Sequence, residues 1–107
     1  MEYQINAIAF RDPDSYELLE SVPDGNFMAE VSVTNLSSTQ MDTVLFVSYT
    51  ADGRMLGFHY AYANPNIGQT MTFGTLIENK DGLVGKVKVM VLSSLAGAQP
   101  LAESVEK

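Results

Sequence analysis

Between residues 27 and 34 the side chains alternate without interruption. One set of positions holds Phe27, Ala29, Val31 and Val33, and the other holds Met28, Glu30, Ser32 and Thr34. Successive side chains of a β-strand point to opposite faces, so a period of two places the first set on a single apolar face. The segment therefore predicts a strand that is buried on one side, and it excludes an amphipathic helix here.

Two further runs alternate in the same way. In one, Met71, Phe73 and Ile77 share a face with Thr75, while Thr70 and Thr72 point the other way. In the other, Val87, Val89 and Val91 alternate with Lys86, Lys88 and Met90. Asp-Gly pairs at 24–25, 52–53 and 81–82 separate the runs and supply the positive φ that tight turns need.

These patterns predict one all-β domain over residues 1–107. We expect strands over 3–10, 16–22, 27–35, 41–50, 54–62, 69–77 and 84–93, with a short last one near 100–105. About seven to eight short strands in such a chain predict an antiparallel two-sheet, immunoglobulin-like sandwich. The residues expected to face inward are Phe27, Ala29, Val31, Val33, Phe46 or its neighbours, Phe73, Val87, Val89 and Val91.

Charge and composition exclude several classes of function. With 6 Lys and Arg against 13 Asp and Glu the net charge is −7, which argues against nucleic acid as a partner. There are 0 Cys, so no disulfide or thiolate metal site can form. No apolar run approaches the roughly 18 residues of a membrane span, and we expect no membrane insertion.

The negative charge is concentrated near the start of the chain. Residues 1–30 contain one base, Arg11, and the acids Glu2, Asp12, Asp14, Glu17, Glu20, Asp24 and Glu30. This distribution predicts a solvated acidic rim at one end of the sandwich.

Three strings resemble a known kind of module. They are Phe27 to Asn35, with the order V-S-V-T-N, then Val44 to Leu56, with Y-T-A-D-G-R, and Val87 to Leu95, followed by Q-P-L-A-E. Together they are similar to immunoglobulin-like or fibronectin-III-like accessory domains of secreted and surface proteins of Gram-positive anaerobes. Met90 and Leu92 stand where that family usually places Phe and Trp, and Ser93 replaces its Asp.

The resemblance implies a non-catalytic structural or protein-interaction module of a larger extracellular or cell-surface protein. Its partners would be neighbouring domains of the same chain or another surface protein. If the module is part of a longer secreted chain, its signal peptide would lie outside this segment, and Met1 could be either native or an expression start.

A search for catalytic or metal-binding chemistry finds little. His59 is the single histidine, and no Gly-x-Ser-x-Gly or phosphate-binding glycine motif occurs. We therefore expect no enzyme activity and no cofactor.

Asp12 and Asp14, with Glu17 nearby, offer oxygen ligands of the kind calcium prefers. Asp and Pro are also common turn formers, so we expect a turn and not a metal site.

The aromatic segment 58–62 is the first candidate for a binding surface. Phe58, Tyr60 and Tyr62 share one face of the expected strand. We expect this face to pack on the opposite sheet, with Leu56 and Phe58 in the core and the tyrosines at its edge. The alternative is an exposed platform on which sugar rings stack, which would make the chain a carbohydrate-binding accessory module.

Met90 and Leu92 are the second candidate. They form an apolar spot on the outer face of the strand at 84–93. We expect the 95–107 tail to cover this spot through Leu95 and Leu101. The alternative is that a neighbouring domain or subunit covers it, since exposed apolar patches often mark contacts.

Overall fold

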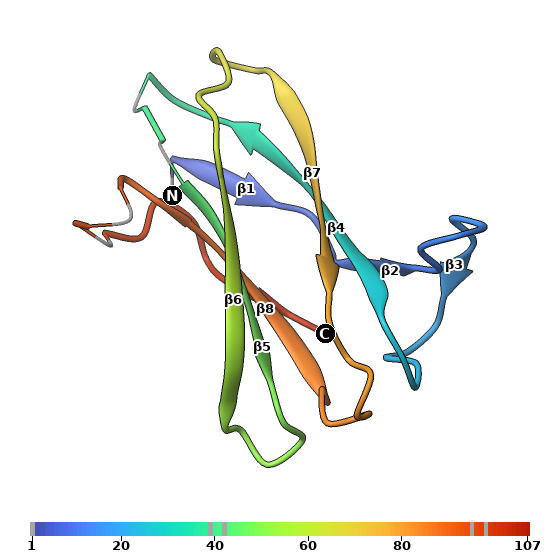
Figure 1. The fold of residues 1–107 in the computed structure, drawn as a ribbon. Coiled ribbons are helices and arrows are strands. Elements are labelled where there is room, and N and C mark those ends of the chain that lie inside the picture. Colours follow the sequence, from blue (N-terminus) through green and yellow to red (C-terminus); the bar gives the residue numbers. More distant parts are fainter. Residues whose placement is uncertain (1, 39, 42, 95, 98) are drawn as a thin grey trace.

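The chain folds as a sandwich of two antiparallel sheets (Figure 1). The structure is a computed structural model that describes residues 2–38, 40–41, 43–94, 96–97 and 99–107. Its strands are β1 (Tyr3–Ile5), β2 (Ala9–Arg11), β3 (Leu18–Leu19), β4 (Phe27–Asn35), β5 (Thr43–Tyr49), β6 (Met55–Tyr62), β7 (Thr70–Ile77), β8 (Lys86–Leu92) and β9 (Val105–Glu106). The all-β, two-sheet prediction is confirmed.

The first sheet is built around β4. Strand β7 pairs with β4 along almost its whole length, from Phe27 opposite Ile77 to Thr34 opposite Thr70. β1 and β2 share the other edge of β4, each pairing with one half of it, and β3 pairs with β2. The second sheet has the order β6-β5-β8-β9.

The core lies between the sheets and follows the predicted alternation. All nine residues expected to face inward are buried, and they belong to one hydrophobic cluster. Tyr3 spans this core, and its hydroxyl accepts a hydrogen bond from the Met41 backbone N–H at 3.0 Å. Burial of these side chains is the main favourable term for the fold.

The first part of the chain is more broken than predicted. The expected strand over 3–10 is divided into β1 and β2, because the chain bends between them and Ile8 turns into the core. The expected strand over 16–22 is reduced to the two residues of β3. The expected strand near 100–105 is also wrong in its limits, since β9 begins at Val105 and Pro100 makes an isolated bridge to Leu92.

Gly85 holds two loops together by close approach. A Cβ atom at this position would lie 2.5 Å from the backbone nitrogen of Ala51, and the Gly85 N–H donates to the Tyr49 carbonyl at 2.8 Å. Backbone atoms cannot move aside as a flexible side chain can. The glycine therefore sets the distance between the turn after β5 and the segment that enters β8.

Replacing Gly85 with alanine is expected to destabilise the fold by about 1–3 kcal/mol, the usual range for overpacking. Gly57→Ala is a matched control, because the nearest atom to a Cβ at position 57 is the Ser48 hydroxyl at 3.8 Å. Urea unfolding of both variants measures the difference. Equal stability of the two variants would contradict the role given to Gly85.

Candidate functional site

The register between β5 and β6 decides which side chains of β6 face solvent. Val44 and Phe46 of β5 point into the core, and they lie opposite Ala61 and His59. Residues opposite each other in an antiparallel pair share a face. The small side chains of β6 and His59 are therefore on the inner side, and its rings are on the outer side.

The three rings of β6 form an exposed row on the outer face of the second sheet. Phe58, Tyr60 and Tyr62 are 52%, 47% and 62% exposed. The rings of Phe58 and Tyr60 have centroids 6.4 Å apart and planes inclined by 23°. Those of Tyr60 and Tyr62 are 5.3 Å apart and meet edge to face at 61°.

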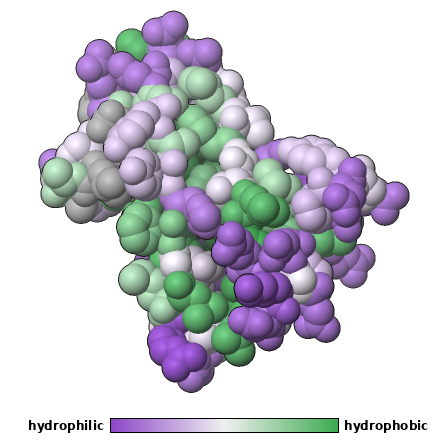
Figure 2. All heavy atoms as spheres, in the orientation of Figure 1, coloured by the Kyte–Doolittle hydropathy of each residue, from purple (hydrophilic) through white to green (hydrophobic). Residues whose placement is uncertain are grey.

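Apolar side chains of β5 and β8 continue this row across the sheet. Leu45 lies opposite Tyr60 on one side and opposite Met90 on the other, and both Leu45 and Met90 are half-buried. Figure 2 shows hydrophobic patches, separated by hydrophilic ones, over the middle and lower part of the molecule, where β5, β6 and β8 run in Figure 1. We call the set Leu45, Phe58, Tyr60, Tyr62 and Met90 the aromatic face.

The expectation that this row packs on the opposite sheet is wrong. Phe58 is half exposed, and Leu56, also expected in the core, is 39% exposed. The physical reason is the register, which turns the even-numbered residues of β6 outward, together with the position of β6 at the edge of its sheet. The large rings of β6 suggested a buried face, but the small residues Gly57 and Ala61 are the ones that face the core side.

Met90 and Leu92 have different surroundings. Leu92 is buried, bridges to Pro100, and is followed by Ser93, whose N–H donates to the Gln99 carbonyl at 2.9 Å. The tail thus runs beside Leu92, as expected. The expectation that Leu101 covers the spot is wrong, because its side chain belongs to the core cluster. Leu95 lies outside the described residues, and Met90 keeps part of its surface exposed.

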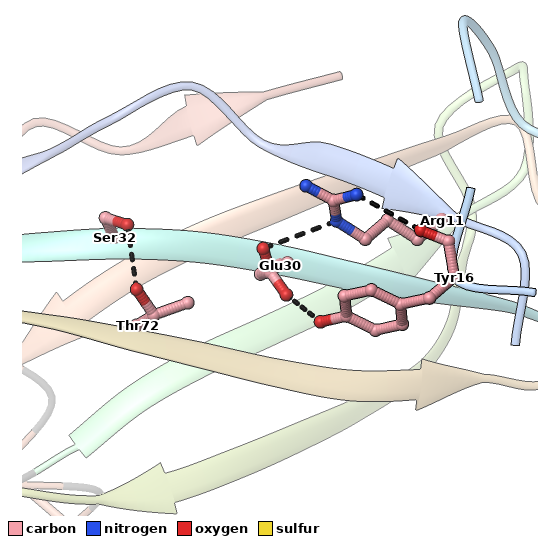
Figure 3. Close-up of polar contacts among 5 residues, drawn as sticks. All are labelled: Arg11, Tyr16, Glu30, Ser32 and Thr72. Atoms are coloured by element: carbon pink, nitrogen blue, oxygen red, sulfur yellow. Dashed lines mark hydrogen bonds and ion pairs between the residues drawn. The ribbon is translucent and has the colours of Figure 1, made fainter. Parts of the chain in front are cut away.

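The outer face of the other sheet is polar and has its own cluster (Figure 3). The Tyr16 hydroxyl donates to the Glu30 carboxylate, and Arg11 forms an ion pair with the same carboxylate at 3.4 Å. Arg11 also donates to the Tyr16 carbonyl at 3.1 Å and lies over the Tyr16 ring. A hydrogen bond of 3.1 Å joins Ser32 to Thr72 further along the sheet.

This cluster fastens a loop to the sheet. Tyr16 has a φ of 61°, a value that costs energy for a residue with a side chain, and its contacts with Arg11 and Glu30 hold it there. Hydrolysis of a glycoside ordinarily uses two facing carboxylates, whereas Glu30 meets a phenol and a guanidinium. The arrangement favours a structural role.

Asp12 forms the turn that the sequence predicted. Its Oδ1 accepts hydrogen bonds from the N–H groups of Asp14 and Ser15, each at 2.9 Å. These backbone donors lower the pKa of the Asp12 carboxyl group. Among the described residues, no three Asp, Glu or His side chains are gathered as they would be around a metal ion.

The hydrogen bond from Tyr16 to Glu30 gives a testable titration. It raises the pKa of the Tyr16 phenol above its ordinary value of 10.0, because the protonated hydroxyl donates to the Glu30 carboxylate and the phenolate cannot. Below pH 10.0, the ordinary pKa of a tyrosine, the contact therefore contributes its full stabilisation to the fold. This contribution is lost as the pH rises through the higher pKa that Tyr16 has in the folded state. Glu30→Gln is expected to lower the pKa of Tyr16.

Ultraviolet absorption of the phenolate follows this titration, and Tyr16→Phe identifies the signal. Ser32→Ala, on the same face, is the control and should leave the titration of Tyr16 where it is. An unchanged pKa of Tyr16 in Glu30→Gln would show that the phenol does not depend on this carboxylate.

Comparisons with known proteins identify the fold alone. No protein-family model matches the chain, and no curated protein is similar to it. A Bacteroides fragilis protein assigned as a β-galactosidase matches with a TM-score of 0.66 and 16% identity, over 99% of this chain and 17% of the other. The β-glucosidase EmGH1 of Erythrobacter marinus matches with a TM-score of 0.55 and 15% identity, over 98% of this chain and 15% of the other.

The chain thus spans less than a fifth of the length of these two proteins. A β-sandwich of this kind occurs as one part of each longer chain. Among the residues that the structure describes, no helix is long and apolar enough to cross a membrane.

Proposed function

We propose that this chain is a non-catalytic accessory module of a larger, glycosidase-like protein, and that the aromatic face is its working surface. The observation that carries the proposal is the exposure of three rings in a row on β6. Exposed apolar side chains that gather in one place often mark a contact or ligand-binding site. The match to 17% and 15% of two longer glycosidase chains supports the modular part of the proposal.

In this function the aromatic face contacts a neighbouring domain of the same protein or another surface protein. Aromatic residues and Met are enriched at protein interfaces, and charged residues are depleted from their centres. The aromatic face has this composition, since it consists of Leu45, Phe58, Tyr60, Tyr62 and Met90. Function outside the cell, at the cell surface or in the medium, is part of the same proposal.

Two experiments test whether the chain is part of a longer protein and whether its aromatic face is covered there. An antibody raised against the chain should detect a polypeptide several times longer than 107 residues in the native organism. Hydroxyl-radical footprinting of that polypeptide should show Tyr60 and Tyr62 protected relative to the isolated chain. A native product of 11.7 kDa, or equal labelling in both forms, would overturn the docking function.

A second function, binding of neutral glycans, is favoured by one specific observation. The rings are exposed with centroid spacings of 5.3 and 6.4 Å, so neighbouring sugar rings can stack along them. Aromatic faces with hydroxyl groups at their edges suit sugars, which carry both C–H faces and hydroxyls. The rings themselves carry no charge and suit an uncharged glycan, while Lys88 lies beside them on the same outer face, across Val47 from Phe58.

A glycan array followed by calorimetric titration tests this second function. Tyr60→Ala and Tyr62→Ala should each weaken binding of a retained oligosaccharide about tenfold or more, in line with the loss of a stacking contact of ~1–3 kcal/mol. Leu18→Ala, at an exposed apolar residue of β3, is the control. Absence of binding to any neutral glycan would leave protein contact as the function of this face.

A further inference from the structure

Strand β6 leaves one side of its backbone unpaired by any other strand in the described structure. It is the end strand of the second sheet and pairs along its length with β5 alone. A strand at the end of a sheet presents a row of N–H and C=O groups to solvent. With 8 residues, β6 offers a long row, in contrast to the two-residue strand β9 at the opposite edge.

The usual protections against pairing through such an edge are missing from β6. Its sequence, MLGFHYAY, contains no Lys, Arg, Asp, Glu or Pro. The only irregularity in its pairing lies at the Met55 end, near Ser48 and Tyr49. Natural edge strands are ordinarily short, charged, bulged or covered, because an unprotected edge pairs with other chains.

The distribution of charge indicates what such an edge can meet. Two copies of a chain with a net charge of −7 repel each other most strongly through residues 1–30, where the acids are concentrated. Residues 43–77, which include β5, β6 and β7, carry one acid, Asp52, and one base, Arg54. Little charge repulsion therefore opposes the approach of two copies through the edge at β6, whose own eight residues include no Lys, Arg, Asp or Glu.

Strand β7 is the other long edge, but it offers less to a partner. Its outward side chains include Thr70, Thr72 and Gly74, and none of these is an apolar ring. Pairing through β6 brings aromatic rings together as well as backbone groups. This favours β6 over β7.

We propose that two copies of this chain pair antiparallel through β6, about a two-fold axis that passes close to His59. Their four-stranded sheets then join into one continuous sheet. Residues opposite each other in an antiparallel pair share a face, so Phe58 and Tyr60 of both copies lie on the same side. The two rows of rings run next to each other, with backbones about 4.8 Å apart, and form one wider surface.

This dimer does not depend on whether the face binds protein or glycan. It is formed by the backbone edge, and its aromatic surface stays open to solvent on one side. Its interface is small, so we expect a weak dimer with a dissociation constant on the order of 10–100 µM.

Sedimentation of the intact chain over a dilution series tests the proposal. The chain should shift from dimer to monomer on dilution. His59→Lys should weaken the dimer about tenfold or more, because it places two like charges beside each other at the paired edge. His59 is exposed and lies on the opposite side of β6 from the rings, so the aromatic face is unchanged.

Leu83→Lys, an exposed apolar residue outside the strands, is the matched control and should leave the dimer intact. Amide hydrogen exchange adds a readout specific for the edge, since amides of residues 56–61 should become more protected as the concentration rises. A monomer at every concentration, association that does not end at a dimer, or a dimer unaffected by His59→Lys would overturn the proposal. A failed glycan titration has no bearing on any of these results.

Discussion

Val89→Asp is expected to leave the chain unfolded at room temperature. Val89 has 0% of its surface exposed, and it lies between Phe46 of β5 and Val105 of β9 in the second sheet. The change removes a buried apolar side chain worth about 1.5–3 kcal/mol. It also places a carboxylate where no cation is at hand, at a cost of several kcal/mol more.

The total stability of a domain of this size is about 5–15 kcal/mol, so the two losses together approach or exceed it. Circular dichroism should show loss of the β-sheet signal, and the cooperative thermal transition should disappear. Met90→Asp is the matched control, one residue further along the same strand on the outer face. It should remain folded because solvent reaches position 90. A folded Val89→Asp variant would contradict the position of this residue in the core.

The alternation of β4 and β8 could be interpreted from the sequence because each strand has a clear apolar set. In β8 the valines alternate with Lys86 and Lys88, and a lysine does not enter a core without a partner. The face of the strand is then decided by its own residues. The same holds for β4, where Glu30 marks the outer side.

The buried side of strand β6 could not be predicted from its own residues in this way. Both of its faces are free of charge, so its own residues do not say which side is buried. The answer comes from the register with β5, in which Val44 and Phe46 face inward and direct Ala61 and His59 to the inner side. Register depends on a partner strand and a turn, which a local pattern does not contain.

The buried polar residues of the loops were also beyond the sequence patterns. Asn79 is buried and accepts a hydrogen bond at Oδ1 from the Val84 N–H at 2.9 Å, while its Nδ2 donates to the Pro23 carbonyl at 2.8 Å. The contact with Pro23 joins segments 56 residues apart in the chain. An Asn near an Asp-Gly turn predicts a loop, but it does not predict which distant carbonyl the side chain will meet.

Ending the chain after Ser94 is expected to cause the second large loss of stability. The deletion removes the core residues Leu101 and Ala102 and the whole of β9. It also removes the bonds from the Leu101 N–H to the Val91 carbonyl, at 2.9 Å, and from the Tyr3 N–H to the Leu101 carbonyl, at 3.0 Å. Losing a buried leucine side chain alone costs about 2–5 kcal/mol.

The deletion also changes the edge of the second sheet. Without β9 the strand β8 becomes an end strand, and backbone groups of Val87, which now bond to Lys107 at 2.8 and 2.9 Å, lose their partners. We therefore expect the truncated chain to melt at a much lower temperature and to self-associate. Thermal melting and light scattering measure the two effects.

A chain that ends after Ser104 separates the two causes. It keeps Leu101 and Ala102 and loses only β9, so it should retain most of the stability while exposing the edge of β8 around Val87 and Val89. Leu101→Ala in the full chain does the reverse, because it empties a core position and keeps the edge covered. If the chain ending after Ser94 has the same melting temperature and light scattering as the full chain, the tail neither completes the core nor covers β8. An intermolecular contact through Met90 and Leu92 then becomes the better explanation of that apolar spot.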